Sequence, residues 1–282
     1  MVNEVGKIAE MVYKDLVARG KRLSTAKEWR AMVLKFEGVC GEKDSYNRND
    51  IIDYVAKLRE DGLCQNTINT QLRPIKLVWQ ILEIERKDNL AFPKLSMEKV
   101  RSSDVKRTMF ERGDIVRMIA EARVKLSKAE LSYLCLATMY GLRREELASL
   151  SEDEVRKGES VKVGTVKGGV VTTHLIPVEV KDYLRGYKAT RADYMTLIFR
   201  RIMSKLGMKF EDGGYGWHSI RRALATELLL ADVSGLNILR FMRWSDASVR
   251  GEFGMLALYA KRVQSEVDLA VFKSHPFLKY WK

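Results

Sequence analysis

Two arginines of this sequence stand at spacings that suit the binding of an anion. Arg143 follows Gly141, at which one helix can end and the next begin, and Glu146 lies three residues after it. A carboxylate at that spacing can hold the guanidinium by a charge-assisted hydrogen bond. His218 and Arg221 also lie one helical turn apart, after a glycine-rich loop. Both segments are candidate phosphate sites because helix starts favour anions, although each alone also fits a surface ion pair or a structural histidine.

Two further segments could supply a proton donor and a nucleophile. Lys167 precedes Gly168 and Gly169 between two β-branched runs, which predicts a hairpin with a lysine at its tip. A lysine there can simply be solvated, or it can reach a bound phosphodiester as a proton donor. Tyr259 follows Trp244 on a short apolar stretch, where a tyrosine by itself is typical of a packed core.

Taken in order, these segments resemble the tyrosine recombinase (integrase) family. The family's first box, G-L-R-x-x-E-L-x-x-L, is similar to residues 141–150 at every fixed position. Its second box, H-x-L/I-R-H-x-x-A-T, resembles residues 218–226 except at Arg222, where a second His is common. At its third position the family often has a Gly-His pair, and Arg243-Trp244 stands there in this sequence. The family's lysine hairpin is similar to the segment around Lys167. The resemblance covers about residues 105–265.

The position of the nucleophile departs from the family's spacing. Phe253 stands where the family's tyrosine usually lies, and Tyr259 follows six residues later with the frequent Ala after it. An insertion of six residues within 249–254 would explain this shift. Tyr280 is the competing candidate, but it lies two residues from the last residue, with almost no helix to hold it.

The resemblance implies a site that clamps one DNA phosphodiester. Arg143 and Arg221 would bind its non-bridging oxygens, since a guanidinium donates two parallel hydrogen bonds and stays charged. Glu146 would orient Arg143 from behind. Trp244 would support the helix of the nucleophile and offer its indole N–H to a phosphate oxygen.

The same resemblance implies the roles in strand cleavage. Tyr259 would attack phosphorus to give a 3′-phosphotyrosyl intermediate and a free 5′-hydroxyl. His218 would be its base or hydrogen-bond partner, and Lys167 would protonate the leaving 5′-oxygen. Neither a metal nor a cofactor is implied, because the phosphotyrosyl bond keeps the energy needed for rejoining.

The elements that must position these residues are predicted to be mainly helical. Residues 1–98 are expected to form a four-helix bundle that resembles the family's core-binding (SAM-like) domain, and 99–106 a linker. Residues 107–282 are expected to form a mostly helical catalytic domain with a small β-hairpin and a C-terminal tail. Helical periodicity or capping residues predict helices at 5–18, 24–36, 51–61, 67–85, 110–126, 128–140 and 145–150, and from about 181 onward.

Composition and charge exclude several classes of protein. The chain has 282 residues with 46% hydrophobic ones, too many for a disordered basic tail, and three unpaired Cys exclude a disulfide framework or a four-ligand zinc site. No apolar run is long enough for a membrane span, and no secretory signal opens the chain. We therefore expect an intracellular protein, cytoplasmic or nucleoid-associated, without a membrane partner.

The net charge of +13 points to a polyanionic partner, and +10 of it lies in residues 101–282. The segment 187–210 has six basic residues and one acidic residue, so it is either a solvated helix face or a surface that binds phosphates. Candidate DNA-binding residues are Lys188, Arg191, Arg200, Arg201, Lys205 and Arg222.

The expected partner is double-stranded DNA, held by two domains that close around it as a clamp. The resemblance implies a homo-oligomer, a tetramer on DNA, with a monomer as one option for the free protein. The tail 264–282 would dock on a neighbouring protomer or pack on its own domain. The absence of an additional arm-binding domain before the bundle is expected for an integrase of a mobile element, and a chromosomal resolvase would look alike. A type IB topoisomerase, a telomere resolvase and an inactive DNA-binding accessory protein are the alternatives.

Overall fold

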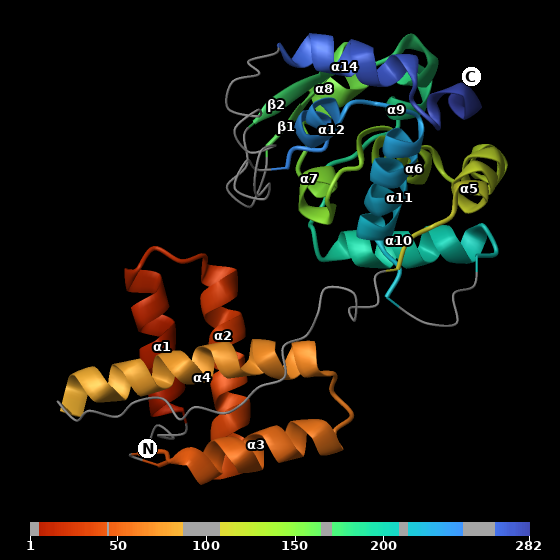
Figure 1. Ribbon diagram of the computed structural model, residues 1–282. Helices are drawn as coiled ribbons and strands as arrows, with labels where there is room; N and C mark the ends of the chain where they lie inside the picture. Colours follow the sequence, from red (N-terminus) through yellow and green to blue (C-terminus); the bar gives the residue numbers. More distant parts are fainter. Residues whose placement is uncertain (1–5, 44, 87–107, 165–170, 209–213, 245–262) are drawn as a thin grey trace. The chain divides into compact units, whose positions relative to one another are not determined.

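The structure is a computed structural model that describes residues 6–43, 45–86, 108–164, 171–208, 214–244 and 263–282. The chain divides into two compact units, Met1–Lys106 and Arg107–Lys282 (Figure 1). The expected linker at 99–106 and the expected insertion at 249–254 lie outside the described residues. So do the expected proton donor Lys167 and the expected nucleophile Tyr259.

The described part of the first unit folds into the four helices that periodicity predicts. Phe36 lies at the centre of its core, with ring centroids 4.8 Å from Tyr46, 5.2 Å from Tyr54 and 6.4 Å from Trp79. Helix α2 packs against each of the other three helices. The helices are α1 (Lys7–Ala18), α2 (Leu23–Cys40), α3 (Arg48–Glu60) and α4 (Gln65–Arg86).

Two predicted helix starts in this unit are wrong, and the caps show why. The side chain of Asn47 accepts the backbone N–H groups of Asn49 and Asp50, and Asp50 accepts the N–H of Asn47 in return. This reciprocal cap starts α3 at Arg48, three residues before the predicted start at 51. Helix α4 likewise begins at Gln65, two residues before the predicted start at 67.

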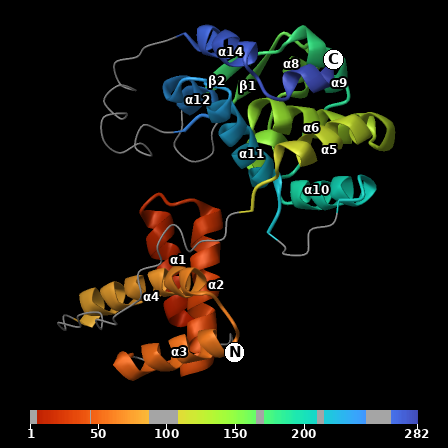
Figure 2. The same cartoon turned by 45° about the vertical axis from the view of Figure 1, so that its right-hand side comes forward.

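The second unit is also mainly helical, and helix α6 is buried at its centre. Helices α5, α7, α9 and α11 all contact α6 (Figures 1 and 2), which explains why it is apolar on every side. The described helices are α5 (Arg112–Lys125), α6 (Lys128–Tyr140), α7 (Arg144–Ala148), α8 (Glu152–Lys157), η2 (Val178–Val180), α9 (Lys181–Leu184), α10 (Tyr194–Lys205), α11 (Trp217–Leu230), α12 (Gly235–Phe241), α14 (Gln264–Lys273) and η4 (Leu278–Trp281).

The predicted hairpin is present as a small antiparallel sheet in the described part of this unit. Strands β1 (Ser160–Val163) and β2 (Thr172–Leu175) pair with Val161 opposite His174. Both of these side chains are buried, and α14 packs along β2. A mainly helical fold with a small β-hairpin is therefore confirmed.

The C-terminal tail packs on its own unit, which is one of the two arrangements expected from the sequence. Trp281 is fully buried, and its indole N–H donates to the Thr138 hydroxyl of α6 over 3.1 Å. Arg123 of α5 donates to the backbone carbonyls of Tyr280 and Lys282 at 2.6 and 2.8 Å. These contacts fix the tail on α5 and α6 of the same chain.

None of the helices in the described residues combines the length and apolar character that crossing a bilayer demands.

Candidate active site

The junction between α6 and α7 presents Arg143. Gly141 ends α6 with φ of 55°, in the left-handed region that glycine adopts most readily. A Cβ atom at this position would lie 2.7 Å from Met242 Cε and 3.3 Å from Leu224 Cδ2. Glycine therefore lets the chain turn sharply inside the core and start the next helix at Arg144.

Arg143 and Glu146 form a two-point contact at the start of α7. The backbone N–H of Arg143 donates to Glu146 Oε2 at 2.9 Å, and its Nη1 donates to Oε1 at 2.6 Å. The Glu146 side chain is 1% exposed and that of Arg143 is 26% exposed. The carboxylate thus holds the guanidinium from the buried side, and the cation stays accessible to a ligand.

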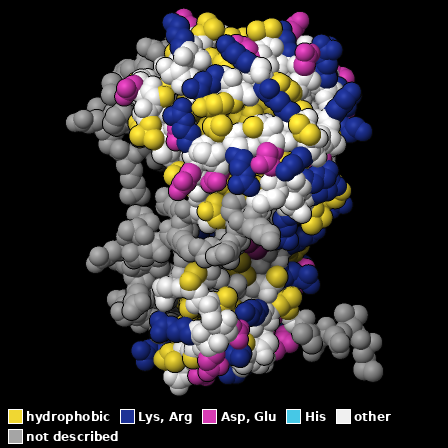
Figure 3. Space-filling view, turned by 90° about the vertical axis from the view of Figure 1, so that its right-hand side faces the viewer, with side chains coloured by type: hydrophobic (Ala, Val, Ile, Leu, Met, Phe, Trp, Pro, Cys, Tyr) yellow, Lys and Arg dark blue, Asp and Glu magenta, His cyan; other side chains and the backbone are white. Residues whose placement is uncertain are grey.

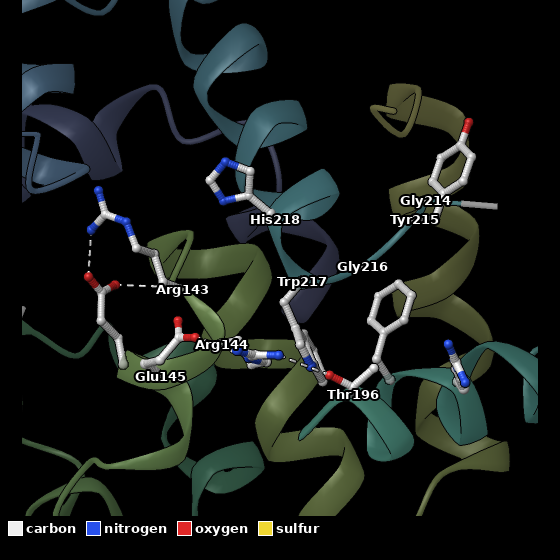
Figure 4. A pocket seen from close by; sticks show the side chains of 12 residues that line it. Arg143, Arg144, Glu145, Thr196, Gly214, Tyr215, Gly216, Trp217 and His218 are labelled. Carbon is white, nitrogen blue, oxygen red and sulfur yellow. Dashed lines mark hydrogen bonds and ion pairs between the residues drawn. The ribbon is translucent and has the colours of Figure 1, made fainter. Parts of the chain in front are cut away.

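A pocket of about 450 Å³ opens beside this pair. Arg143 and His218 both line it, Arg143 from the α6–α7 junction and His218 from the first turn of α11 (Figure 4). The remaining lining comes from α7, from α10, from the loop before α11 and from the first residue of α11. Those residues are Arg144, Glu145, Glu146, Thr196, Phe199, Arg200, Gly214, Tyr215, Gly216 and Trp217.

Trp217, the residue before His218, fixes the first turn of α11. This side chain is buried, and its indole N–H donates to the backbone carbonyl of Met195 on α10 at 2.8 Å. The hydroxyl of Ser219 accepts the N–H of Gly216 and closes the turn. The exposed imidazole of His218 is therefore presented from a rigid helix start.

Arg221 occupies a different environment from His218, although one helical turn separates them. It is 2% exposed and is absent from the described lining of the pocket. Its guanidinium donates to the carbonyl oxygen of Gly141 at 2.6 Å and also to that of Met242. Burial, together with the nearby cations Arg243 and Arg143, lowers the pKa of Arg221 to about 8. Arg221 thus ties α11 to the turn that carries Arg143.

Trp244 lies next to this buried guanidinium. The Arg221 Cζ atom is 5.9 Å from the centre of the Trp244 ring, and Trp244 is 38% exposed. A cation over an indole face is attracted by the ring quadrupole. The structure therefore brings together four described residues of the expected site, Arg143, Glu146, Arg221 and Trp244, and places His218 on the same pocket as Arg143.

Arg243 is a member of this cluster that the sequence did not reveal. Its Nη2 lies 3.2 Å from Glu146 Oε2, so one carboxylate contacts both Arg143 and Arg243. Burial alone would raise the pKa of Glu146, but Arg243 and the hydrogen bonds from Arg143 outweigh it and hold that pKa below its usual value. The signal in the sequence was a long charged residue directly before Trp244, in the place of the frequent glycine.

The six candidate DNA-binding residues differ in how they are engaged. Arg201 and Lys205 both contact the buried carboxylate of Glu130 at 2.7 Å. Hydrogen bonds from Lys205, Ser127 and Arg201 hold the pKa of Glu130 down at about 2, against its burial. Arg191 pairs with Asp193. Arg200 lines the pocket, Arg222 donates to the Thr108 carbonyl, and Lys188 is exposed.

Lysine and arginine side chains are spread over the surface of the second unit. On the face drawn in Figure 3 they alternate with hydrophobic and acidic side chains. Among the described residues, no three His, Cys, Asp or Glu side chains come together as metal ligands would. The pocket combines an accessible guanidinium and an imidazole, a set that can bind a phosphate group and exchange a proton with it.

Comparisons with known proteins identify the fold. No protein-family model matches the sequence, and no curated protein sequence matches it significantly. A fragment of lambda integrase, solved as a dimer bound to a COC′ core site, is 13% identical with a TM-score of 0.66, over 87% of this chain and 97% of that one.

Two further solved structures agree with this result. Lambda integrase as a tetramer bound to a Holliday junction is 13% identical with a TM-score of 0.66, over 87% of this chain and 79% of that one. A fragment of the Tn1549 transposon integrase with transposon right end DNA is 17% identical with a TM-score of 0.58, over 89% and 98% of the two chains. The chain has the fold of tyrosine recombinases, as the resemblance in its sequence implies.

Proposed function

We propose that this chain is a site-specific DNA recombinase that cleaves and rejoins DNA through a phosphotyrosyl intermediate. The observation that carries the proposal is the pocket lined by Arg143 and His218, with the carboxylate of Glu146 buried behind the guanidinium. Such a pocket suits one phosphodiester of double-stranded DNA. The fold of DNA-bound integrases supports the same substrate.

Arg143 is the main anchor for the scissile phosphate. Glu146 fixes its guanidinium, so little freedom remains to be lost when the phosphate binds. Arg221 adds charge from the buried side. Two of its N–H groups point at backbone carbonyls, and each Nη atom carries a second hydrogen that a phosphate oxygen could accept.

The covalent step follows from these roles. The phenolic oxygen of Tyr259 forms a bond to phosphorus while the bond from phosphorus to the 5′-oxygen breaks. His218 accepts the phenolic proton, and Lys167 donates a proton to the leaving 5′-oxygen. Rejoining is the reverse: a 5′-hydroxyl attacks the phosphotyrosyl group and releases Tyr259. The arginines neutralise the charge that develops on the phosphate oxygens.

Exchange between two duplexes requires several protomers, so we extend the proposal to a tetramer on DNA. Lambda integrase has been solved as a tetramer on a Holliday junction, which supports this extension. Because the aromatic tail is buried in its own unit, the protomer contacts of this chain would use other surfaces.

Covalent capture tests the proposal. The full-length chain is incubated with short duplexes of random sequence. Each duplex carries a nick, so that cleavage releases a short strand with a free 5′-hydroxyl, which diffuses away and prevents rejoining. The strands that stay with the denatured protein are then sequenced. We expect recovered strands that share a sequence and are attached at their 3′ ends.

Two tyrosine variants serve as a matched pair in this experiment. Tyr259→Phe should abolish capture, and Tyr280→Phe should leave it intact, because Tyr280 belongs to the packed tail. Capture that survives Tyr259→Phe would refute the assignment of Tyr259 as the nucleophile. Sequence-independent capture would favour a topoisomerase, and binding without any capture would favour an accessory protein.

A further inference from the structure

Arg243 is held in a backbone conformation that residues other than glycine rarely adopt. Its φ is 54°, and Asp232, with φ of 56°, is the other such residue in the described part of the chain. This conformation crowds the Cβ atom against the following carbonyl. The Arg243 side chain is also fully buried, which removes a guanidinium from water. A glycine here would avoid both costs, so stability alone does not account for the arginine.

Five acceptors surround the buried guanidinium. Nη1 lies 2.9 Å from the Phe241 carbonyl and 3.2 Å from His174 Nε2. Nη2 lies 3.0 Å from the Tyr140 carbonyl, 3.2 Å from Glu146 Oε2 and 3.5 Å from the carbonyl of Gly141 at the end of α6. These partners come from α12, β2, the end of α6 and α7. One side chain therefore fixes four elements around the α6–α7 junction that presents Arg143.

The contact with His174 fixes the state of that imidazole. A guanidinium only donates, so Nε2 accepts and the proton lies on Nδ1, which donates to Asp268 Oδ1 at 2.9 Å. The other carboxylate oxygen of Asp268 accepts the backbone N–H of Leu175 at 2.7 Å. Burial lowers the pKa of His174 and outweighs the hydrogen bond to Asp268, which raises it, and the charge of Arg243 lowers it further.

These contacts form one chain of hydrogen bonds from the pocket to the C-terminal region. It runs from Arg143 through Glu146, Arg243 and His174 to Asp268 on α14. Helix α14 begins directly after segment 245–262, which contains Tyr259. The chain thus links the anchor of the phosphate to the helix that follows the proposed nucleophile in the sequence.

We propose that Arg243 is a positioning residue for strand cleavage. It fixes the Glu146 carboxylate, and through it the Arg143 guanidinium, relative to the helix that follows Tyr259. The catalytic part of this inference rests on the proposed function, whereas the linkage between Arg243 and Glu146 does not.

Arg243→Gly tests the positioning role in the full-length chain, because it deletes the guanidinium and also relieves the backbone. On a captured duplex we expect the single-turnover cleavage rate to fall about 10- to 100-fold, as when a group that orients another is removed. The Kd for the duplex should change little. Asp232→Gly is the matched control: it relieves the same conformation at an exposed residue, and cleavage should remain at the wild-type rate.

A second readout does not depend on activity. The Glu146 carboxyl is followed by carbon NMR as the pH is varied; Arg143, Arg243, Arg221 and His174 are the charged or titratable groups that act near it. We expect Arg243→Gly to raise the pKa of Glu146 by about one pH unit or more, because the variant loses one of the two cations that contact this carboxylate. Arg243→Lys, which keeps the charge, should leave it low.

The acidic limb of the plot of cleavage rate against pH should shift together with the pKa of Glu146. Arg243→Gly should recover cleavage as the pH rises, and millimolar guanidinium ion, which can enter the vacated space, should restore part of the rate. A purely structural role would produce neither effect.

The outcomes separate the two claims. An unchanged Glu146 titration in Arg243→Gly overturns the inference, whether or not the protein cleaves DNA. A shifted titration with wild-type cleavage at every pH overturns the positioning role. Absence of cleavage by the wild type refutes the proposed function and the catalytic role of Arg243 together, and the titration still decides the linkage. If Arg243→Gly does not fold, Arg243→Lys decides the linkage. A pKa of Glu146 above the usual value of a glutamate in that variant overturns the linkage.

Discussion

The carbonyl oxygen of Gly141 accepts a hydrogen bond of 2.6 Å from the guanidinium of Arg221. The bond joins the end of α6 to α11, two segments 80 residues apart in the sequence. It places the turn that carries Arg143 against the helix that carries His218. The two sequence boxes are thus connected through the backbone of one and the side chain of the other.

Gly141→Ala should destabilise the fold more than a substitution that only strains the backbone. Gly141 and Gly207 both have positive φ, but a Cβ at Gly207 meets nothing within 4 Å among the described residues. We expect Gly207→Ala to cost about 1–2 kcal/mol of unfolding free energy from the backbone alone. Gly141→Ala adds the clash with Met242 and should cost about 2–4 kcal/mol. Equal losses in urea unfolding would contradict the packing described here.

Glu146→Gln should destabilise the second unit strongly, because it leaves Arg143 and buried Arg243 without their carboxylate. Removing one partner of a buried ion pair costs about 3–5 kcal/mol. The control is Glu145→Gln, whose contact with Arg144 is partly exposed and should contribute at most about 1 kcal/mol. Urea unfolding of both variants compares the losses, and similar losses would show that Glu146 does not hold the two arginines.

The stability of the second unit should fall as the pH is lowered from 6.5 toward 4. Burial lowers the pKa of His275 to about 4, although the hydrogen bond from its Nε2–H to the Met139 carbonyl acts in the opposite direction. Its Nδ1 atom accepts two backbone N–H groups, so the folded protein has no place for a second proton on this ring. The unfolded chain therefore binds more protons in this window, and full stability holds above pH 6.5. The loss for this residue is on the order of 3 kcal/mol.

His275→Gln isolates this effect. The amide can keep the bond to Met139 and does not titrate, so the dependence of urea unfolding on pH between 6.5 and 5 should become flatter. The lowered pKa of His174 acts in the same direction and leaves some slope. An equally steep dependence in the variant would rule out His275 as the source.

Arg200 and Arg201 are adjacent in the sequence but should respond differently to mutation. Arg200 lines the pocket, whereas Arg201 contacts Glu130. Arg200→Ala should weaken binding to duplex DNA and reduce the slope of log K against log salt by about 0.9 if it contacts one phosphate. Arg201→Ala should leave the slope unchanged and lower the melting temperature. The opposite pattern in a salt titration would place the DNA backbone along the other arginine.

Trp281→Ala should destabilise the second unit by about 3–5 kcal/mol, the usual cost of deleting a buried tryptophan side chain. The exposed neighbour Lys282 supplies the control, since Lys282→Ala should change stability little. A tail that leaves its own unit to bind a neighbour would give a different result: wild-type stability of the monomer and loss of assembly on DNA.

Local signals in the sequence were sufficient for much of the fold. Helix α6 runs over the predicted residues because Ser127 caps its start and Gly141 ends it, and both signals lie within one turn of the boundary. The contact between Arg143 and Glu146 is equally local, at a separation of three residues. The predicted start of α3 lay three residues late because the polar residues Asn49 and Asp50, which are typical of a helix cap, stand inside its first turn.

Contacts between distant segments could not be derived in this way. Helical spacing puts His218 and Arg221 on one face, but it does not say that the neighbouring α6–α7 junction buries the second of them. Glu130 pairs with Arg201 from a position 71 residues away, and a run of basic residues does not reveal such a contact. The role of Arg243 depends likewise on partners from four elements.

The most direct test of the account is mass spectrometry of the protein trapped on nicked DNA, after nuclease and trypsin digestion. The tryptic peptide 251–261 contains Tyr259 as its one tyrosine. If Tyr259 is the nucleophile, this peptide carries a nucleotide linked to the tyrosine through its 3′-phosphate. A nucleotide on any other peptide, or a trapped complex without a modified tyrosine, would contradict the account.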